Sequence, residues 1–401
     1  MGESRNLSAL PTRFQVHASA EALADLEARL RQTHWPDDFA NADWLYGTNG
    51  DYLRSLVDYW INDFDWAEQE RAINAFDHYR VDVDGLPIHF IREPGRGPNP
   101  IPLILSHGWP WTFWDLHEVI GPLADPAAFG GDPEDAFEVI VPSLPGFGFS
   151  TPLRKPGINF WRTADLWHAL MTDVLGFERF AAQGGDWGAL VTAQLGHKYA
   201  PSLFGIHLTN LIPLTLFNHQ RPWDITAGTL VSDDLPPAER EAALAQQRRI
   251  ASHVAVQVLD PQTLGYGLHD SPVGLLAWLL ERRYTWGDCN GDVESRFSKE
   301  HLLTTAMLYW LTNSFVTSAR YYAEAAHNPW QPSHNRVPRV EVPAGVTHLG
   351  GDVGRGVIDS VRGDFDIRYE NSHPTGGHFA PAEEPEVVIN DIRATFRALR
   401  G

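Results

Sequence analysis

The stretch Gly184-Gly185-Asp186-Trp187-Gly188 could form a sharp turn that presents a nucleophile. A nucleophile elbow joins a strand to a helix and carries small residues two positions before and after the nucleophile, because most β-carbons would clash there. Here the central residue is Asp186. A carboxylate is a poor nucleophile for acyl transfer, but it can attack a saturated carbon and form an ester on the protein. The alternative is an ordinary glycine-rich turn in which Asp186 caps a helix.

An ester on Asp186 would have to be hydrolysed, which requires a base that activates water and a partner that orients the base. Where the nucleophile sits on such an elbow, the chain order is nucleophile, acid, histidine. Of the 18 histidines, His378 lies in Gly376-Gly377-His378, between the last predicted strand and the last predicted helix. Because a parallel sheet presents such loops at its carboxyl edge, His378 is the candidate base. The alternative is a histidine on a surface loop.

The acid that orients this base should follow the preceding strand. The strand predicted over Val342–Leu349 leads through two glycines to Asp352, which is therefore the candidate. Three competitors lie further along the chain, where a solvated loop carboxylate is the default: Asp359, Asp364 and Asp366.

Two backbone N–H groups could hold the negative charge that develops when an ester on the nucleophile is hydrolysed. One is that of Trp187, directly after the nucleophile, and the other is that of Trp109, in the loop His107-Gly108-Trp109-Pro110 after the third predicted strand. The alternative for this loop is a simple chain reversal with a cis-proline.

Alternating strands and helices surround these residues. Phe180–Gln183 predicts a buried strand before the turn, and Ala189–Tyr199 predicts a helix after it. Further strands are predicted at Tyr79–Val83, Leu86–Ile91, Ile101–Ser106, Phe137–Pro142, Leu203–Leu208, Val342–Leu349 and Phe365–Tyr369. The alternation predicts an α/β fold with a mostly parallel central sheet and helices on both faces.

The same patterns divide the chain into three parts. Residues 1–75 are mostly helical in pattern and rich in aromatic residues, which predicts an N-terminal helical extension that wraps the core. Residues 76–210 and 331–401 contain the predicted strands and form the α/β core. Residues 211–330 carry helical patterns instead, which predicts a helical lid inserted over the carboxyl edge of the sheet. The lid helices are predicted at Pro237–Ala255, Gly274–Arg283 and Leu302–Ala325.

Composition narrows the classes of partner and the compartment. The 401 residues carry a formal net charge of −20, which argues against nucleic acid and anionic membranes as partners. Cys289 is the single cysteine, so no intramolecular disulfide can form and a reducing cytoplasm is the expected setting. The sequence contains no run of the ~20 apolar residues that a membrane-spanning helix needs, so no membrane association is expected.

Several long motifs occur together along the whole chain. They are Thr33-His34-Trp35-Pro36, Asp58-Tyr59-Trp60, Asp84-Gly85-Leu86-Pro87-Ile88-His89-Phe90-Ile91, His107-Gly108-Trp109-Pro110, Pro145-Gly146-Phe147-Gly148-Phe149-Ser150, Gly184-Gly185-Asp186-Trp187-Gly188, Arg320-Tyr321-Tyr322, Gly376-Gly377-His378-Phe379-Ala380 and Glu383-Glu384-Pro385-Glu386. In these motifs the chain resembles the epoxide hydrolases of the α/β-hydrolase superfamily. The similarity is to the microsomal, juvenile-hormone, fungal and bacterial branch, which carries an N-terminal extension.

This resemblance implies that Asp186 attacks an epoxide carbon and that His378, oriented by Asp352, activates the water that releases a vicinal diol. It also implies two lid tyrosines that protonate or hydrogen-bond the epoxide oxygen. Tyr322 matches one of them, whereas a gap-free comparison places His253 at the other. A second lid donor at His253 and a plain packing role there are both open. No cofactor or metal is implied, and a soluble protein is expected.

Two other functions use the same residues. A dehalogenase also attacks through an aspartate elbow, and its halide could be bound by the indole N–H groups of Trp109 and Trp187. A non-catalytic protein that binds a ligand in the same fold is the third possibility, and the histidine at position 253 is its only motivation. For the enzyme, the aromatic lid predicts a bulky apolar epoxide as the substrate, and a homodimer is an open expectation.

Overall fold

A single mixed sheet forms the centre of the computed structural model, which describes residues 10–218, 231, 234–353 and 361–400. Within these residues the sheet has nine strands in the order β1-β2-β3-β5-β4-β6-β7-β8-β9. The strands are β1 (Thr12–Phe14), β2 (His78–Val83), β3 (Leu86–Glu93), β4 (Ile101–Ser106), β5 (Phe137–Pro142), β6 (Phe180–Gly184), β7 (Leu203–Leu208), β8 (Val340–Leu349) and β9 (Phe365–His373).

The sheet is parallel from β5 to β9 in spatial order and antiparallel at its β1-β2-β3 end. The prediction of a mostly parallel sheet is therefore confirmed, and Asp84-Gly85 forms the turn between β2 and β3. One difference concerns the N-terminal segment, where Thr12–Phe14 pairs with β2 as an edge strand. A strand of three residues is too short to show an alternating pattern in the sequence.

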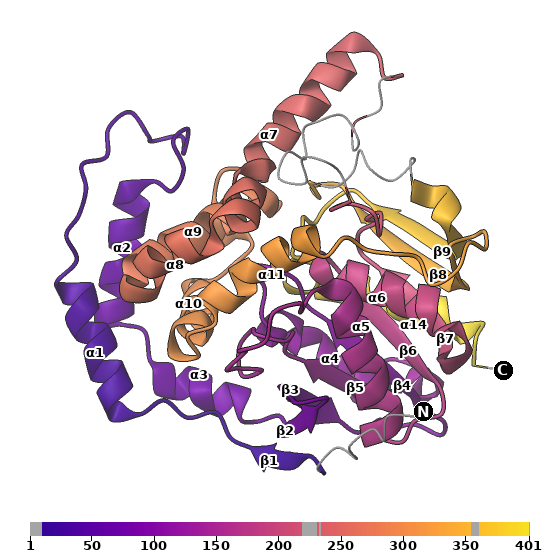
Figure 1. The fold of residues 1–401 in the computed structure, drawn as a ribbon. Coiled ribbons are helices and arrows are strands. Elements are labelled where there is room, and N and C mark those ends of the chain that lie inside the picture. Colours follow the sequence, from indigo (N-terminus) through magenta and orange to yellow (C-terminus); the bar gives the residue numbers. More distant parts are fainter. Residues whose placement is uncertain (1–9, 219–230, 232–233, 354–360, 401) are drawn as a thin grey trace.

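Helices cover both faces of the sheet. Gly196 of α6 (Trp187–Lys198) lies against Ile206, whereas the neighbouring Gly205 lies against Phe396 of α14 (Pro385–Arg397). Because adjacent residues of a strand point to opposite faces, α6 and α14 lie on opposite sides. Two further helices, α5 (Phe160–Ala169) and α4 (His117–Ala124), pack against α6 and α14 respectively (Figure 1).

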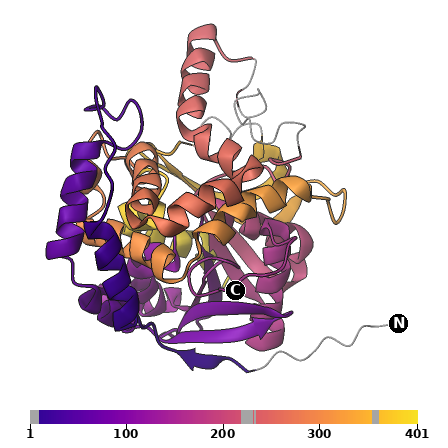
Figure 2. The same ribbon diagram turned by 60° about the vertical axis from the view of Figure 1, so that its left-hand side comes forward.

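In the part that the structure describes, the segment between β7 and β8 consists of helices joined by connecting loops. Its helices are α7 (Pro237–Leu259), α8 (Pro261–Asp270), α9 (Pro272–Trp286), α10 (Lys299–Leu311) and α11 (Phe315–His327). The single predicted helix Leu302–Ala325 is two helices, because the chain turns at Asn313 with a φ of 54°. In Figures 1 and 2 the outer half of α7 projects from the body of the molecule, whereas α8 to α11 lie beside the sheet.

The N-terminal helices are α1 (Ala20–Arg31), α2 (Gly50–Asn62) and α3 (Trp66–Ile73). α1 contacts α9 and α3 contacts α10, and Figure 2 shows α1 and α2 along one side of the helices that follow β7. The loop before α2 holds α9: the Thr48 hydroxyl donates to the Ala277 carbonyl at 2.7 Å, and Trp44 stacks on Tyr284 with ring centroids 4.0 Å apart. At the end of α8, Arg29 forms an ion pair of 2.7 Å with Asp270.

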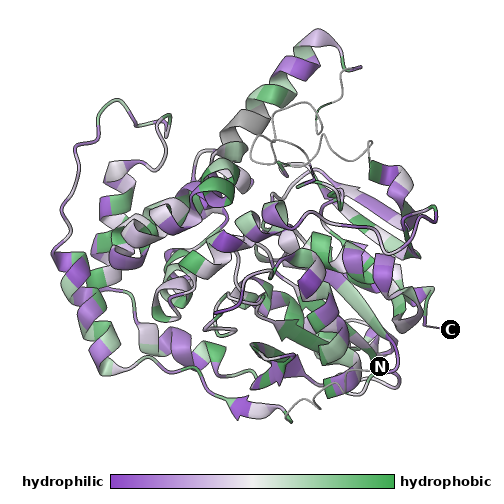
Figure 3. Ribbon diagram, in the orientation of Figure 1, coloured by the Kyte–Doolittle hydropathy of each residue, from purple (hydrophilic) through white to green (hydrophobic). Residues whose placement is uncertain are grey.

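The core runs through the central strands, where Figure 3 shows hydrophobic residues concentrated. Leu103, Ile104 and Leu105 of β4 are fully buried, and so are the large indoles of Trp109 and Trp111 that follow this strand. Among the helices that the structure describes, none is both long enough and apolar enough to span a membrane.

Candidate active site

The turn at Asp186 has the strand-to-helix geometry expected of an elbow. β6 ends at Gly184 and α6 begins at Trp187, while Asp186 between them adopts a φ of 52° and a ψ of −125°. Left-handed backbone is costly for a residue with a β-carbon and persists only where the surroundings enforce it. The glycines are required by close packing, because a β-carbon at Gly188 would lie 2.0 Å from the Ser106 carbonyl oxygen.

The structure brings three of the predicted residues together from three loops. The Nε2 atom of His378 lies 3.2 Å from one carboxylate oxygen of Asp186, and its Nδ1 atom lies 3.2 Å from a carboxylate oxygen of Asp352. His378 and Asp352 are buried. This is the arrangement of a base held between a nucleophile and an orienting acid.

The competing carboxylates are placed elsewhere or are not described. Asp364 forms an ion pair with Arg339, and Asp366 forms one with Arg368. Asp359 lies outside the described residues.

The two carboxylates control the protonation of His378. Burial alone would lower the pKa of this imidazole, but hydrogen bonds and charges from Asp186 and Asp352 outweigh burial and raise the pKa to about 10. His378 is therefore an imidazolium at neutral pH while both carboxylates are ionised. Neutralising either carboxylate would lower this pKa and make the imidazole available as a base.

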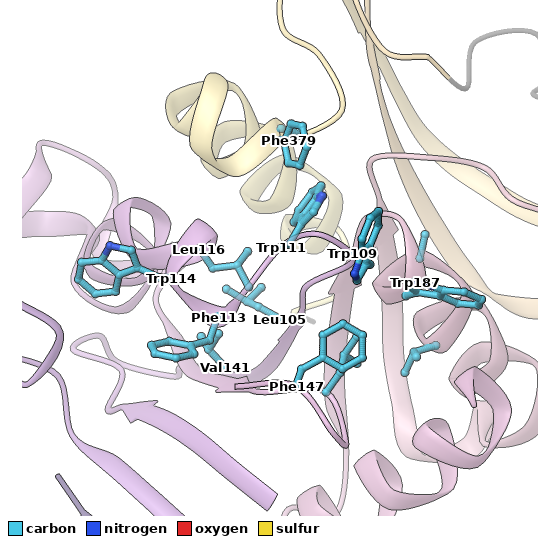
Figure 4. Packing of buried hydrophobic residues seen from close by; sticks show 14 of the residues in the cluster. Leu105, Trp109, Trp111, Phe113, Trp114, Leu116, Val141, Phe147, Trp187 and Phe379 are labelled. Atoms are coloured by element: carbon cyan, nitrogen blue, oxygen red, sulfur yellow. The ribbon is translucent and has the colours of Figure 1, made fainter. Parts of the chain in front are cut away.

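The second oxygen of Asp186 already has a backbone donor. The N–H of Trp109 donates to it at 2.8 Å. This approach requires a glycine before Trp109, since a β-carbon at Gly108 would lie 2.4 Å from the same oxygen. The Trp109–Pro110 peptide is cis. The N–H of Trp187 opens α6, where N–H groups have no acceptor within the helix. Figure 4 shows both Trp109 and Trp187 among the buried residues of the hydrophobic core.

Both predicted lid residues contact Trp109, and Tyr322 also contacts Trp187. Tyr322 of α11 packs edge-on against Trp187 and Trp109, with centroid distances of 4.7 and 5.8 Å. His253 of α7 stacks on Trp109 at 5.2 Å and meets the Tyr322 ring edge-on at 5.3 Å. Burial, together with the nearby Asp186 charge, raises the pKa of Tyr322 well above its usual value. The phenol therefore keeps its proton and can act as a donor.

Asn210, which no sequence motif pointed to, links two of these residues. Its side-chain oxygen accepts a hydrogen bond of 2.9 Å from the Asp186 N–H, and its side-chain amide donates to Asp352. Asn210 follows β7, the strand beside β6. Its place at the carboxyl edge of the sheet is a signal that could have identified it.

Trp286, at the end of α9, is a further residue that the sequence did not single out. Its ring lies 5.2 Å from that of His378 and 4.7 Å from that of His253. Trp286 thus contacts both His378 and His253. In the described part of the chain, no group of three or more His, Cys, Asp or Glu side chains is arranged to hold a metal ion.

The sheet order and the elbow after β6 define an α/β-hydrolase fold, here with a carboxylate at the tip of the elbow. Comparison with protein families agrees: residues 101–252 match the family described as alpha/beta hydrolase fold, and residues 11–116 match the one described as Epoxide hydrolase N terminus.

Individual relatives cover almost the whole chain. It is 38% identical to a putative epoxide hydrolase of Stigmatella aurantiaca, over 97% of this chain and 85% of the relative. It is 35% identical to epoxide hydrolase 1 of Oryctolagus cuniculus, over 94% of this chain and 87% of the relative. The crystal structure of juvenile hormone epoxide hydrolase from the silkworm Bombyx mori is similar with a TM-score of 0.82 and 27% identity, over 97% and 95% of the two chains. The protein belongs to the epoxide hydrolases.

Proposed function

We propose that this epoxide hydrolase converts its substrate to a vicinal diol through an ester on Asp186. One observation carries the proposal: the two oxygens of the Asp186 carboxylate face different partners. One lies 3.2 Å from the His378 imidazole, and the other accepts the Trp109 N–H at 2.8 Å. The carboxylate is thus held in one orientation, with a base beside it that can activate water once an ester has formed.

In the first step, a carboxylate oxygen of Asp186 attacks an epoxide carbon and the carbon–oxygen bond of the ring breaks. The released oxygen takes the proton of the Tyr322 phenol, with His253 as a second donor to the same oxygen. The His378 imidazolium then returns a proton to Tyr322. This transfer is favoured because the ester no longer carries the negative charge that held the proton on His378.

In the second step, the neutral His378 takes a proton from water as the water oxygen adds to the ester carbonyl. The N–H groups of Trp109 and Trp187 would stabilise the resulting oxyanion. The intermediate then collapses: the bond to the glycol oxygen breaks, and this oxygen takes the proton of the hydroxyl group that water added to the Asp186 carbon. Asp186 thereby returns as a carboxylate beside a charged His378. The sum is one epoxide and one water consumed for each diol.

A bulky, largely apolar epoxide is the proposed substrate, and the rings around the site support it. Trp286 lies on the His378 side, and Phe217 stacks on Trp187 at 5.1 Å next to Tyr322. Buried aromatic rings of this kind stabilise apolar ligands by contact area and leave orientation to the few polar groups.

A single turnover in ¹⁸O-water tests the ester mechanism. With enzyme in excess, we expect the first diol to take its new oxygen from the unlabelled Asp186 carboxylate, and the label to appear in Asp186. Mass spectrometry of the peptide that contains Asp186 measures this exchange. The Asp186→Asn variant, which lacks the carboxylate, is the control and should form no ester. Diol labelled from water in that first turnover would contradict the mechanism.

A dehalogenase activity is the second candidate, because a leaving halide needs N–H donors. Within the described residues, the indole N–H of Trp109 is buried and meets no acceptor. A halide leaves without needing a proton, whereas the protonated Tyr322 suits an epoxide oxygen. We therefore expect no halide release from small haloalkanes, and release as fast as epoxide hydrolysis would favour this second candidate. The family assignment decides against the third possibility, a non-catalytic ligand-binding protein.

A further inference from the structure

One carboxylate holds the backbone on both sides of His378. The N–H groups of Gly377 and Phe379 donate to the two oxygens of Glu383, each at 2.9 Å. Glu383 ends the short helix α13 (Ala380–Glu383), directly after the loop that carries His378. Hydrogen bonds to an ionised acceptor are among the stronger ones in proteins. The Glu383 side chain therefore holds the chain immediately before and immediately after His378.

The same carboxylate connects this loop to the lid. The N–H of Asp288, just beyond the end of α9, donates to Glu383 at 2.8 Å. In return, the Asp288 carboxylate accepts the Gly376 N–H at 3.0 Å, and the Trp286 carbonyl accepts the His378 N–H at 3.0 Å. All four N–H groups of residues 376–379 thus donate either to Glu383 or to the end of lid helix α9.

Glu383 occupies this place at a cost in free energy. It is buried, and burial raises the pKa of its carboxyl group, which the three backbone donors partly counteract. Its neighbour Glu384 is different, since its carboxylate pairs with the Arg296 guanidinium at 2.9 Å and accepts none of these loop N–H groups. Burying a carboxylate is expensive unless hydrogen bonds replace its lost contacts with water, and the three backbone N–H groups supply them here.

We propose that Glu383 is a positioning residue for His378, which it fixes against the end of lid helix α9. The inference rests on the proposed ester mechanism. Ester formation is carried by Asp186, whereas ester hydrolysis depends on the imidazole being held against water and carbonyl. A displacement of about 1 Å in a catalytic group can cost about 10²-fold in rate. Loosening this loop should therefore slow the second step far more than the first.

The test compares Glu383→Gln with Glu384→Gln by rapid quench and intact-protein mass spectrometry during a single turnover of an epoxide such as styrene oxide. A glutamine at position 383 has a single acceptor oxygen, so its NH₂ group faces one of the loop N–H donors. We expect ester to form in Glu383→Gln within a few-fold of the wild-type rate and to decay about 10²-fold more slowly, so that ester accumulates. Glu384→Gln, whose partner Arg296 also contacts Asp288, should slow ester decay far less than Glu383→Gln.

A second variant covers the case in which Glu383→Gln does not fold. Asp288→Asn weakens the same loop at Gly376, and slower ester decay is expected there too. Ester that decays at the wild-type rate in Glu383→Gln overturns the role of Glu383 and leaves the ester mechanism standing. Where Glu383→Gln does not fold, the same result in Asp288→Asn has this meaning. If wild-type enzyme and variants form no ester at all, the proposed function fails and this inference fails with it.

Discussion

At the scale of single residues, the site depends on one imidazole shared by two carboxylates. Asp186 and Asp352 each lie 3.2 Å from a nitrogen of His378, and Asn210 contacts both acids. The proposed reaction uses this balance, because ester formation removes one of the two charges. His378 would then be a protonated imidazolium in the free enzyme and a neutral imidazole, able to act as a base, once the ester on Asp186 has formed.

The pKa of His378 tests this balance. In the wild type we expect the imidazole to titrate at about 10, and in Asp352→Asn at a clearly lower pH, because one charge and one hydrogen bond are lost. NMR titration of ¹³C,¹⁵N-histidine-labelled protein measures both values, and a wild-type pKa near the ordinary 6.5 would contradict the expectation.

The raised pKa also predicts the sign of a stability change. Because the folded pKa lies above the unfolded one, the stabilisation by the His378 proton is fully present below pH 6.5. It is lost as the pH rises toward about 10. Urea unfolding across this range should show wild-type stability falling more steeply than that of Asp352→Asn.

At the scale of elements, the elbow depends on glycines between β4, β6 and α6. We predict that Gly188→Ala destabilises the protein by about 1–3 kcal/mol or more and abolishes activity, because the new methyl group meets the Ser106 carbonyl oxygen. Gly267→Ala in α8 is the matched control, since its β-carbon meets nothing within 4 Å. In a helix interior that change should stabilise by up to about 1 kcal/mol.

Urea unfolding and a diol-formation assay measure both variants. If Gly188→Ala and Gly267→Ala lost equal amounts of unfolding free energy and activity, close packing at the elbow would not explain the effect of Gly188→Ala.

A buried ion pair fastens lid helix α9 to the loop after β4. Arg283 donates to Asp115 at 2.6 Å, and its guanidinium lies 3.9 Å from the centre of the Phe379 ring. Both charged groups are almost fully buried. Burial would raise the pKa of Asp115, but Arg283 and His301 hold it below its usual range.

Removing one member of a buried pair leaves an uncompensated charge. We therefore predict that Arg283→Met costs about 3–5 kcal/mol of unfolding free energy. Arg13→Met removes an exposed pair with Asp77 and should cost only about 0–1 kcal/mol. Guanidinium-induced unfolding measures the free energy of unfolding of both variants. Similar losses in Arg283→Met and Arg13→Met would contradict the prediction.

At the scale of the whole molecule, helix α9 is held from two sides, by the segment before α2 and by the loop that carries His378. The N-terminal extension contributes β1 to the sheet and also packs on α9 through Trp44 and Thr48. Asp288, just beyond the end of α9, in turn contacts the loop that carries His378 through Glu383 and Gly376. Residues far from the chemistry are thereby connected to the site through one helix.

Trp44→Ala tests this connection. The stacked pair with Tyr284 is worth about 0.5–1.5 kcal/mol beyond its buried area, so amide exchange in α9 should rise about 2–10-fold. Hydrogen exchange followed by mass spectrometry measures it, with peptides from β4 to β6 as the internal reference. Exchange that rises equally in those strands would indicate general destabilisation instead.

Local patterns predicted most elements because their causes are local. Ser19 caps α1 through its own side chain, and the hairpin at Asp84-Gly85 needs only its own turn residues. Among the features that escaped are the strand Thr12–Phe14, which forms only because β2 lies beside it, and the break at Asn313 between α10 and α11.

The sequence by itself determined the chemistry that the protein can attempt. The carboxylate between glycines at position 186, the histidine after the last strand and the acid at position 352 follow from residue type and from place relative to strand ends. The tertiary structure alone decided which groups hold them. Asn210 and Asp352 are 142 residues apart, and Arg283 and Asp115 are 168 apart. Such contacts leave no local pattern, because hydrogen bonds and ion pairs depend on distances in space that only the folded chain sets.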